Sequence, residues 1–231
     1  MTAPDEHPVG GVCWLDLGTR EPTTTAAFYS ALLEWQVAPP DDAGYQLVSR
    51  DGHLTAALGP AEDLGDPYWT PYIRTLDVQA SVRRCAEAGG TVVVAPATVG
   101  DLGHFATIRD PRGATLSLWQ PGLHRGTWSD GGHGAVAPPI LLTPDRQASE
   151  AFLAAVVDWS TSPAGMHGPA GQKAVHVRER RRDTAVWAAQ FHVRDPEAGR
   201  LKALSLGARI SDTGLMTDPA GALFALTDSP T

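Results

Sequence analysis

Residues 26–35 read AAFYSALLEW and residues 150–159 read EAFLAAVVDW, so one aromatic-anchored phrase occurs twice at an offset of 124 residues. A second phrase, DPRGA at residues 110–114, returns as DPAGA at residues 218–222. The order of the two phrases is kept, and their offset changes only by the length of a short loop. A tandem duplication explains this pattern, and it predicts two halves with the same fold and with corresponding candidate sites.

The first half has the hydrophobic pattern of two consecutive βαβββ modules. In the first module, Phe28, Leu32 and Trp35 share one face of a helix that begins near Pro22, where the missing N–H of proline costs little. In the second, Asp77 is placed to cap a helix that ends at the Gly89-Gly90 pair. The strands expected around these helices cover residues 12–17, 45–49, 53–58, 71–76, 91–95, 104–109 and 114–119.

The second half repeats this plan more loosely. Its expected strands cover residues 138–142, 174–178, 184–193 and 221–227, and its expected helices cover 145–159 and a segment that starts at Asp195. The segment between the halves is rich in Gly, Ser and His, which is typical of a linker. We therefore expect a first domain at 10–121, a linker at 122–133 and a second, more degenerate domain at 134–228.

Composition excludes several classes of partner. The chain has 231 residues and 42% hydrophobic side chains, enough for a packed core in each half. Its net charge of −8 argues against nucleic acid or an anionic membrane as the partner, and no apolar run is long enough to span a bilayer. The N-terminus lacks the basic and apolar regions of a signal peptide, and Cys13 and Cys85 lie in apolar segments. We expect a cytoplasmic protein with two buried, reduced thiols.

The strand, the helix ending F-Y-x-x-L-L-x-W and the D-P-x-G-x turn before a last strand resemble the vicinal oxygen chelate superfamily. This superfamily includes glyoxalases, bleomycin-resistance proteins and extradiol dioxygenases, and the nearest form is the tandem glyoxalase-like protein of actinobacteria. The resemblance implies an α+β fold of two tandem glyoxalase-like domains. In each, paired βαβββ modules form a cup-shaped, antiparallel-rich sheet with its helices outside. Such a fold hosts many reactions, so it does not by itself define one.

Metal-dependent members of this superfamily place His or Glu at equivalent points of the first, fourth, fifth and eighth strands. The resemblance assigns three of these points to Trp14, Thr70 and Ser117, and the fourth-strand point to residues 55–58. In the second cup the corresponding residues are Pro138, Ala188 and Ala225. A divalent cation needs three or four imidazole, thiolate or carboxylate ligands, which these side chains do not provide. We expect neither a metal nor another cofactor.

Strand alternation predicts what faces the first cup instead. If Trp14 faces inward, the expected ligand-binding set is Trp14, Thr70, Thr115, Ser117 and Trp119. The expected catalytic set is Asp16, Tyr72, Arg74 and His104, with Asp16 or His104 moving a proton and Arg74 or Tyr72 stabilising an oxyanion. The alternatives are that the two tryptophans fill a cup that has lost its ligand, and that Asp16 and Arg74 form an ordinary ion pair at the rim. His104 begins a strand close to the mouth of the first cup, and the alternative there is a surface residue.

The second cup has a mostly aliphatic inward set, which favours a filled, structural interior. Gln190 and His192 are its polar candidates for ligand contact.

Three functions remain open. The first is a metal-independent lyase, isomerase or cyclase of specialised metabolism, acting on a partly aromatic or polar small molecule in the first cup. The second is a protein that sequesters an antibiotic or metabolite without turnover, and the third is a structural or regulatory protein with both cups filled. We expect a monomer, with a dimer as the alternative, because the duplication already supplies all four modules.

Overall fold

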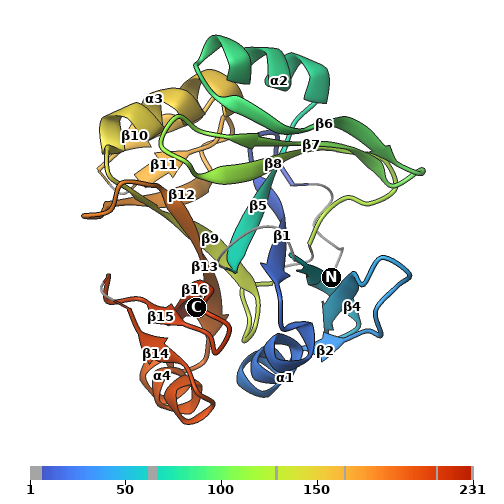
Figure 1. Cartoon of the computed structure of the whole chain (residues 1–231), viewed down its shortest axis with the longest axis vertical. Helices are drawn as coiled ribbons and strands as arrows, with labels where there is room; N and C mark the ends of the chain where they lie inside the picture. The colour runs from blue at the N-terminus through green and yellow to red at the C-terminus, as the bar shows by residue number, and fades with distance from the viewer. Residues whose placement is uncertain (1–6, 62–66, 128–129, 164, 212, 230–231) are drawn as a thin grey trace. The chain divides into compact units, whose positions relative to one another are not determined.

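The computed structural model describes residues 7–61, 67–127, 130–163, 165–211 and 213–229, which form four helices and sixteen strands (Figure 1). The first half contains β1 (Val12–Thr19), α1 (Pro22–Leu33), β2 (Gln36–Val37), β3 (Gln46–Arg50), β4 (His53–Pro60), β5 (Tyr68–Arg74), α2 (Val78–Glu87), β6 (Thr91–Val99), β7 (Gly103–Arg109) and β8 (Thr115–Pro121). The second half contains β9 (Val136–Thr143), α3 (Arg146–Val157), β10 (Ser160–Ser162), β11 (Gly165–His167), β12 (Lys173–Glu179), β13 (Val186–Val193), α4 (Pro196–Ser205), β14 (Arg209–Ile210), β15 (Met216–Thr217) and β16 (Leu223–Asp228).

The strands form two eight-stranded sheets of matching topology. Their orders are β2-β3-β4-β1-β5-β8-β7-β6 and β10-β11-β12-β9-β13-β16-β15-β14. In each module the first strand pairs in parallel with the last, as β1 does with β4 and β5 with β8, while the hairpin strands pair antiparallel. The predicted α+β architecture of four βαβββ modules is confirmed.

A hydroxyl pair links the first strand of a module to the helix that follows it. A threonine at or just after the end of the strand shares a hydrogen bond with a hydroxyl six residues later. These pairs are Thr19–Thr25 at 3.1 Å, Thr75–Ser81 at 2.8 Å and Thr143–Ser149 at 2.8 Å. The fourth module has Val193 and Gly199 at these positions, and a Cβ on Gly199 would lie 3.6 Å from Val193 Cγ2. The tight strand-to-helix connection is therefore common to all four modules, and the fourth makes it through apolar contact.

The main elements lie close to their predicted positions, and the differences concern short strands at or next to the sheet edges. Asp77, Asp145 and Asp195 cap α2, α3 and α4, each accepting hydrogen bonds from backbone N–H groups of the first turn. The strands β2, β10, β11, β14 and β15 were not predicted, because two or three residues are too few to show an alternating pattern. Among the described residues, no helix has both the length and the apolar character needed to cross a bilayer.

The chain divides into two compact units that do not follow its linear order. Unit 1 comprises residues 1–14, 70–126 and 138–187, and unit 2 comprises residues 15–69, 127–137 and 188–231. Each unit thus combines most of one module from each half of the sequence. The predicted boundaries at 10–121 and 134–228 enclose the two sheets, and their standing as separate domains stays a prediction.

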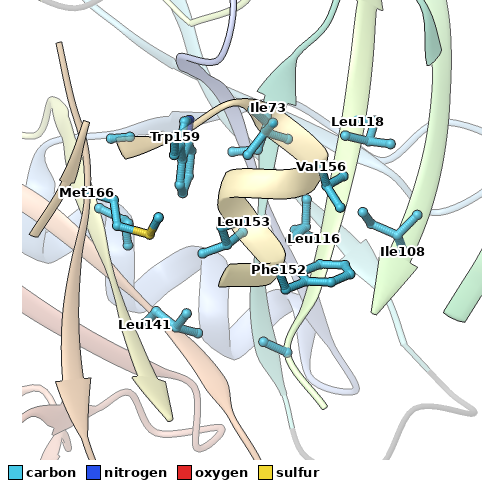
Figure 2. Close-up of a cluster of buried hydrophobic side chains, with 14 of the residues drawn as sticks. Ile73, Ile108, Leu116, Leu118, Leu141, Phe152, Leu153, Val156, Trp159 and Met166 are labelled. Carbon is cyan, nitrogen blue, oxygen red and sulfur yellow. The ribbon is translucent and has the colours of Figure 1, made fainter. Parts of the chain in front are cut away.

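Each unit has its own hydrophobic core. In unit 1, Phe152, Leu153 and Val156 of α3 pack among residues of β5, β7 and β8, such as Ile73 and Leu116 (Figure 2). The core of unit 2 is assembled around α1 in the same way. It is rich in aromatic rings, namely Phe28, Tyr29, Trp35, Trp69, Phe191 and Phe224. Burial of these faces is the main driving force for folding of each unit.

The repeated D-P-x-G-A turn is held by its aspartate. Asp110 Oδ1 accepts the N–H groups of Ala114 at 2.7 Å and Arg112 at 3.0 Å, and its Oδ2 accepts the hydroxyl of Ser149 on α3 at 3.0 Å. In unit 2, Asp218 Oδ1 accepts the N–H groups of Gly221 and Ala222 in the same manner. Burial raises the pKa of both carboxyl groups, and these hydrogen bonds oppose the rise.

Candidate functional site

In unit 1, the candidate site is the face of β5, β7 and β8 that points away from the core. Residues such as Ile73, Leu116 and Leu118 point into the core, so their strand neighbours point the other way. The register sets Tyr72 beside Ser117 and Arg74 beside Trp119. The outward set comprises Thr70, Tyr72, Arg74, Phe105, Thr107, Arg109, Thr115, Ser117 and Trp119, which we call the site face. All six outward residues expected on β5 and β8 lie on it.

Aromatic rings gather on this face. The ring of His124 lies 4.6 Å from that of Trp14 at an interplanar angle of 88°, and 5.6 Å from that of Trp119 at 70°. Tyr72 lies 6.4 Å from Trp119, again edge to face. Such T-shaped arrangements match the positive edge of one ring to the negative face of another. We call Trp14, Tyr72, Trp119 and His124 the aromatic cluster. Its two tryptophans are only 4% and 5% exposed.

His124 reaches the cluster from a segment that follows β8, residues 122–126, which we call the strap. The N–H groups of Gly122 and His124 donate to the carbonyl of Leu102 at 2.8 and 3.1 Å. The indole N–H of Trp119 donates to the carbonyl of His124 at 3.0 Å. Burial lowers the pKa of His124, and the charge of His7 lowers it further, so the imidazole is neutral at pH 7. The sequence pattern predicted a linker here and gave no sign of this histidine's position.

Polar groups surround the aromatic cluster on the site face. Thr107 and Ser117 share a hydrogen bond of 2.9 Å, and Arg109 Nε donates to Thr115 Oγ1 at 3.3 Å. The guanidinium of Arg74 donates to the backbone carbonyl of His7. Arg109 was not among the predicted residues, although its position two residues beyond Thr107 on one strand would have placed it on this face.

Asp16 belongs to unit 2 and lies opposite Ala57 of β4 in the parallel register. It is half-buried, and its Oδ1 accepts the phenol hydroxyl of Tyr45 at 2.7 Å. Tyr45 was expected to begin a strand at residues 45–49, but it lies just before β3, and no sequence pattern indicated its contact with Asp16.

His104 does not lie where it was expected, at the mouth of the first cup. In the β7–β8 ladder it stands opposite Gln120, while Phe105 stands opposite Trp119. Residues directly opposite one another share a face, so His104 lies on the helix side with Ala106 and Ile108. It is exposed, and its Nδ1 is 3.0 Å from Thr98 Oγ1. It lines an open cavity of about 580 Å³ beside the start of α2, together with Asp77 and Val78 among others.

In unit 2, Gln190 and His192 lie on the face of β13 opposite the core residues Ala189, Phe191 and Val193, as alternation predicted. Gln190 is buried and stands beside Ala225 of β16. His192 Nδ1 is 2.7 Å from the backbone carbonyl of Asp228. This contact fixes the imidazole to the neighbouring strand.

The residues at the positions assigned to metal ligands do not fit a divalent cation. Trp14 belongs to the aromatic cluster, and the hydroxyl of Ser117 is bonded to Thr107. Within the described parts of the chain, no three His, Cys, Asp or Glu side chains gather closely enough to hold an ion. A hydroxyl and an indole are poor substitutes for the imidazole and carboxylate ligands that such ions require.

Comparison with known proteins agrees with this fold. A glyoxalase-like domain family matches residues 13–119. The anthracycline biosynthesis protein DauV of Streptomyces sp. (strain C5) is 30% identical over 95% of this chain and 93% of its own length. The Mn(II)-bound glyoxalase of Novosphingobium aromaticivorans superposes with a TM-score of 0.69 at 14% identity, over 96% of this chain and 82% of that one. The 2,2',3-trihydroxybiphenyl 1,2-dioxygenase of Sphingomonas wittichii gives 0.63 at 14% identity, over 96% and 92%. The chain therefore belongs to the glyoxalase-like proteins of the vicinal oxygen chelate superfamily.

Proposed function

We propose that this protein is an enzyme of specialised metabolism that acts, without a metal ion, on a planar and partly polar organic molecule. The observation that carries the proposal is the aromatic cluster on the site face, with Arg74 and Ser117 beside it. Aromatic side chains bind flat rings, and a few polar groups around them fix orientation. The similarity to DauV, named for anthracycline biosynthesis, supports a polycyclic aromatic substrate.

The side chains present support a class of reaction. In the proposed reaction Arg74 stabilises an oxyanion that develops on the substrate, with Tyr72 as a further hydrogen-bond donor. The sequence predicts that Asp16 is the proton-transfer group, and its replacement by Asn tests that prediction. These groups suit proton abstraction and return, which is the chemistry of a lyase, isomerase or cyclase. A substrate carbonyl with an acidic neighbouring C–H is the functional group that such chemistry needs.

Binding is tested with a hydroxylated anthraquinone as the probe, followed through quenching of tryptophan fluorescence. Trp14→Ala should weaken binding about tenfold, because it removes one wall of the cluster. His104→Ala is the matched control, since it alters the opposite face of the same sheet and should leave the affinity unchanged. If Trp14→Ala and His104→Ala bind the probe equally well, the ligand site is elsewhere.

Turnover is tested separately from binding. A panel of polycyclic aromatic ketones is incubated with metal-depleted protein. Products are separated by liquid chromatography and identified by mass spectrometry. Isomerised or cyclised product is expected with the native chain and is expected to vanish with Asp16→Asn, while the binding of the probe is kept. Elemental analysis that finds stoichiometric zinc, iron or manganese, together with activity that depends on it, would overturn metal independence.

The second candidate function is sequestration of a similar ligand without turnover. The hydrogen bonds within the site face favour it, since Thr107 with Ser117 and Arg109 with Thr115 satisfy one another and leave the rings as the main contact surface. It predicts that Asp16→Asn retains the ligand as well as the native chain does, and that neither protein forms product.

A further inference from the structure

We infer that His124 occupies the position of a ligand ring in the aromatic cluster, and that a planar aromatic ligand binds there by displacing this imidazole and the strap that carries it. The inference rests on the proposed function and adds a regulatory element to the same site. It concerns residues 14, 72, 119 and 122–126, all of them in unit 1.

The first support is the kind of group that the cluster holds. His124 presents a flat heteroaromatic ring, and it contacts both Trp14 and Trp119 edge to face. The cluster therefore accepts a planar ring from the protein itself. A substrate ring of similar thickness would use the same indole surfaces, so the two rings compete for one position.

The second support is that the strap directs one side chain into the cluster and its neighbours into solvent. Leu123 is 71% exposed and Arg125 is also exposed, whereas His124 is half-buried. Leu123 is more apolar than His124, yet Leu123 is the side chain left in solvent. Apolar burial therefore does not explain why His124 enters the cluster. The selection follows from the backbone path, which is set by the anchors at the two ends of the strap.

The third support is the way these ends are fixed. At Gly122 a Cβ would lie 2.4 Å from the carbonyl of Asp101, and at Gly126, where φ is +115°, a Cβ would lie 2.5 Å from the carbonyl of Cys13. Glycine at both positions allows the close approach that pins the ends. Between them, the carbonyl of His124 is held by the side chain of Trp119, which itself belongs to the cluster. A ligand that moves the Trp119 indole therefore also breaks one of the hydrogen bonds that hold the strap.

Displacement should reduce the apparent affinity of the native chain, because only the open fraction of molecules binds ligand. His124→Ala removes the competing ring and should bind the hydroxylated anthraquinone about tenfold more tightly than the native chain. His124→Phe keeps a planar ring in place and should bind no more tightly than the native chain. Leu123→Ala, which trims an exposed side chain of the same strap, is the matched control and should leave the affinity unchanged.

Kinetics provide an independent readout. In stopped-flow fluorescence the native chain should show an association rate that reaches a plateau at high probe concentration, set by strap opening, and His124→Ala should lose the plateau. Addition of the probe should also move the NMR signal of the His124 Cε1–H group, with His124→Phe identifying that signal by its absence. Circular dichroism of each variant shows that it is folded.

The outcomes separate this inference from the proposed function. Equal affinities for the native chain and His124→Ala, with a linear association rate, would show a strap that does not compete, and would leave the aromatic ligand site standing. Absence of probe binding by both proteins would overturn the ligand site and the strap's role together. Binding by His124→Ala alone would support both.

Discussion

The indole N–H of Trp159 donates to the backbone carbonyl of Gly10 at 2.6 Å, although 149 residues separate them. Both residues lie in unit 1, where Gly10 stands just before β1. In unit 2, Trp35 donates to the carbonyl of Gly134, just before β9, at 2.8 Å. Gly10 and Gly134 differ by the same 124 positions as Trp35 and Trp159. The tryptophan that ends each repeated phrase thus fastens the start of the other half's first strand.

We expect Trp159→Phe to lower the free energy of unfolding of unit 1 by about 1–3 kcal/mol, because the buried Gly10 carbonyl loses its donor. Trp35→Phe should have a similar effect in unit 2. Chemical denaturation followed by circular dichroism measures both. Trp187→Phe is the control, since Trp187 is equally buried but its indole N–H has no hydrogen-bond partner among the residues that the structure describes. A larger loss from Trp187→Phe than from Trp159→Phe would show that ring packing, not the hydrogen bond, dominates.

Gly103 tests how tightly the β7–β8 hairpin holds Trp119. Its φ is +153°, and a Cβ would lie 2.6 Å from the carbonyl of Gln120 and 2.7 Å from Trp119 Cζ2. Gly103→Ala should therefore destabilise unit 1 by about 2 kcal/mol or more and displace the Trp119 indole. Gly100→Ala, in the preceding turn with φ +50° and open space around it, should cost only the backbone strain, about 1 kcal/mol. Thermal denaturation compares the two, and equal losses would contradict the close approach of Gly103 to the Trp119 ring.

The two cysteines should be unreactive in the folded protein. Burial raises the pKa of Cys13 to about 12, and its thiol donates to the carbonyl of Tyr72 at 3.5 Å. Burial also raises the pKa of Cys85. Because the thiolate is the reactive form, Ellman's reagent at pH 8 should label neither thiol until the chain is unfolded in guanidinium, when both react. Rapid stoichiometric labelling of native protein would contradict the burial of these groups.

Stability should fall as the pH is lowered through the range in which histidine is protonated. Burial lowers the pKa of His124, His133 and His176 below their ordinary value of 6.5, so the folded state favours their neutral form. Their contribution is fully present above pH 6.5 and is lost as the pH falls through their lowered folded-state pKa values. Denaturation at intervals from pH 8 to pH 5 should show this decline.

His124→Gln should make the decline shallower, since one of the three groups is removed, and an unchanged slope would contradict the burial of His124. Asp110 and Asp218 act with the opposite sign. Their pKa values are raised above the ordinary value, so the cost of ionising them is relieved as the pH falls through their folded-state pKa values.

Much of the fold was predictable because the sequence contains the same pattern twice. The phrases around Phe28 and Phe152 and the two D-P-x-G-A turns fix equivalent points in the two halves, and aspartate caps mark three helices. Strand alternation predicted that Trp14 and every second residue of β5 and β8 share one face. Alternate residues of a strand point to opposite sides, so the neighbours of the buried Ile73 and Leu116 must face away from the core. The hydroxyl residues of each pair, such as Thr75 and Ser81, can be read in the sequence. Their hydrogen bond could not be predicted from a spacing of six residues without the geometry of the turn between strand and helix.

The rest of the site depends on contacts that no local pattern encodes. His104 was expected at the cup because it begins a strand, yet the alternation that gives Ala106 to the core also gives His104 to that side. The strap has neither periodicity nor apolar runs, so the position of His124 follows only from the anchors at Gly122 and Gly126. Tyr45, which donates to Asp16, likewise lies outside regular structure. A composition typical of a linker predicts only that the segment connects two parts of the chain. It does not predict which of its side chains packs against the fold.

The composition of unit 1 has a consequence for biosynthesis. When the nascent chain has left the ribosome as far as β8, the strands β5, β7 and β8 already carry Ile73, Ile108 and Leu116, but α3, which supplies Phe152 and Val156 to the same core, has yet to emerge. The first half of the chain therefore exposes an apolar surface until α3 packs against it. A stop codon between the two repeats would release a fragment prone to aggregation, although its sequence reads as a complete domain.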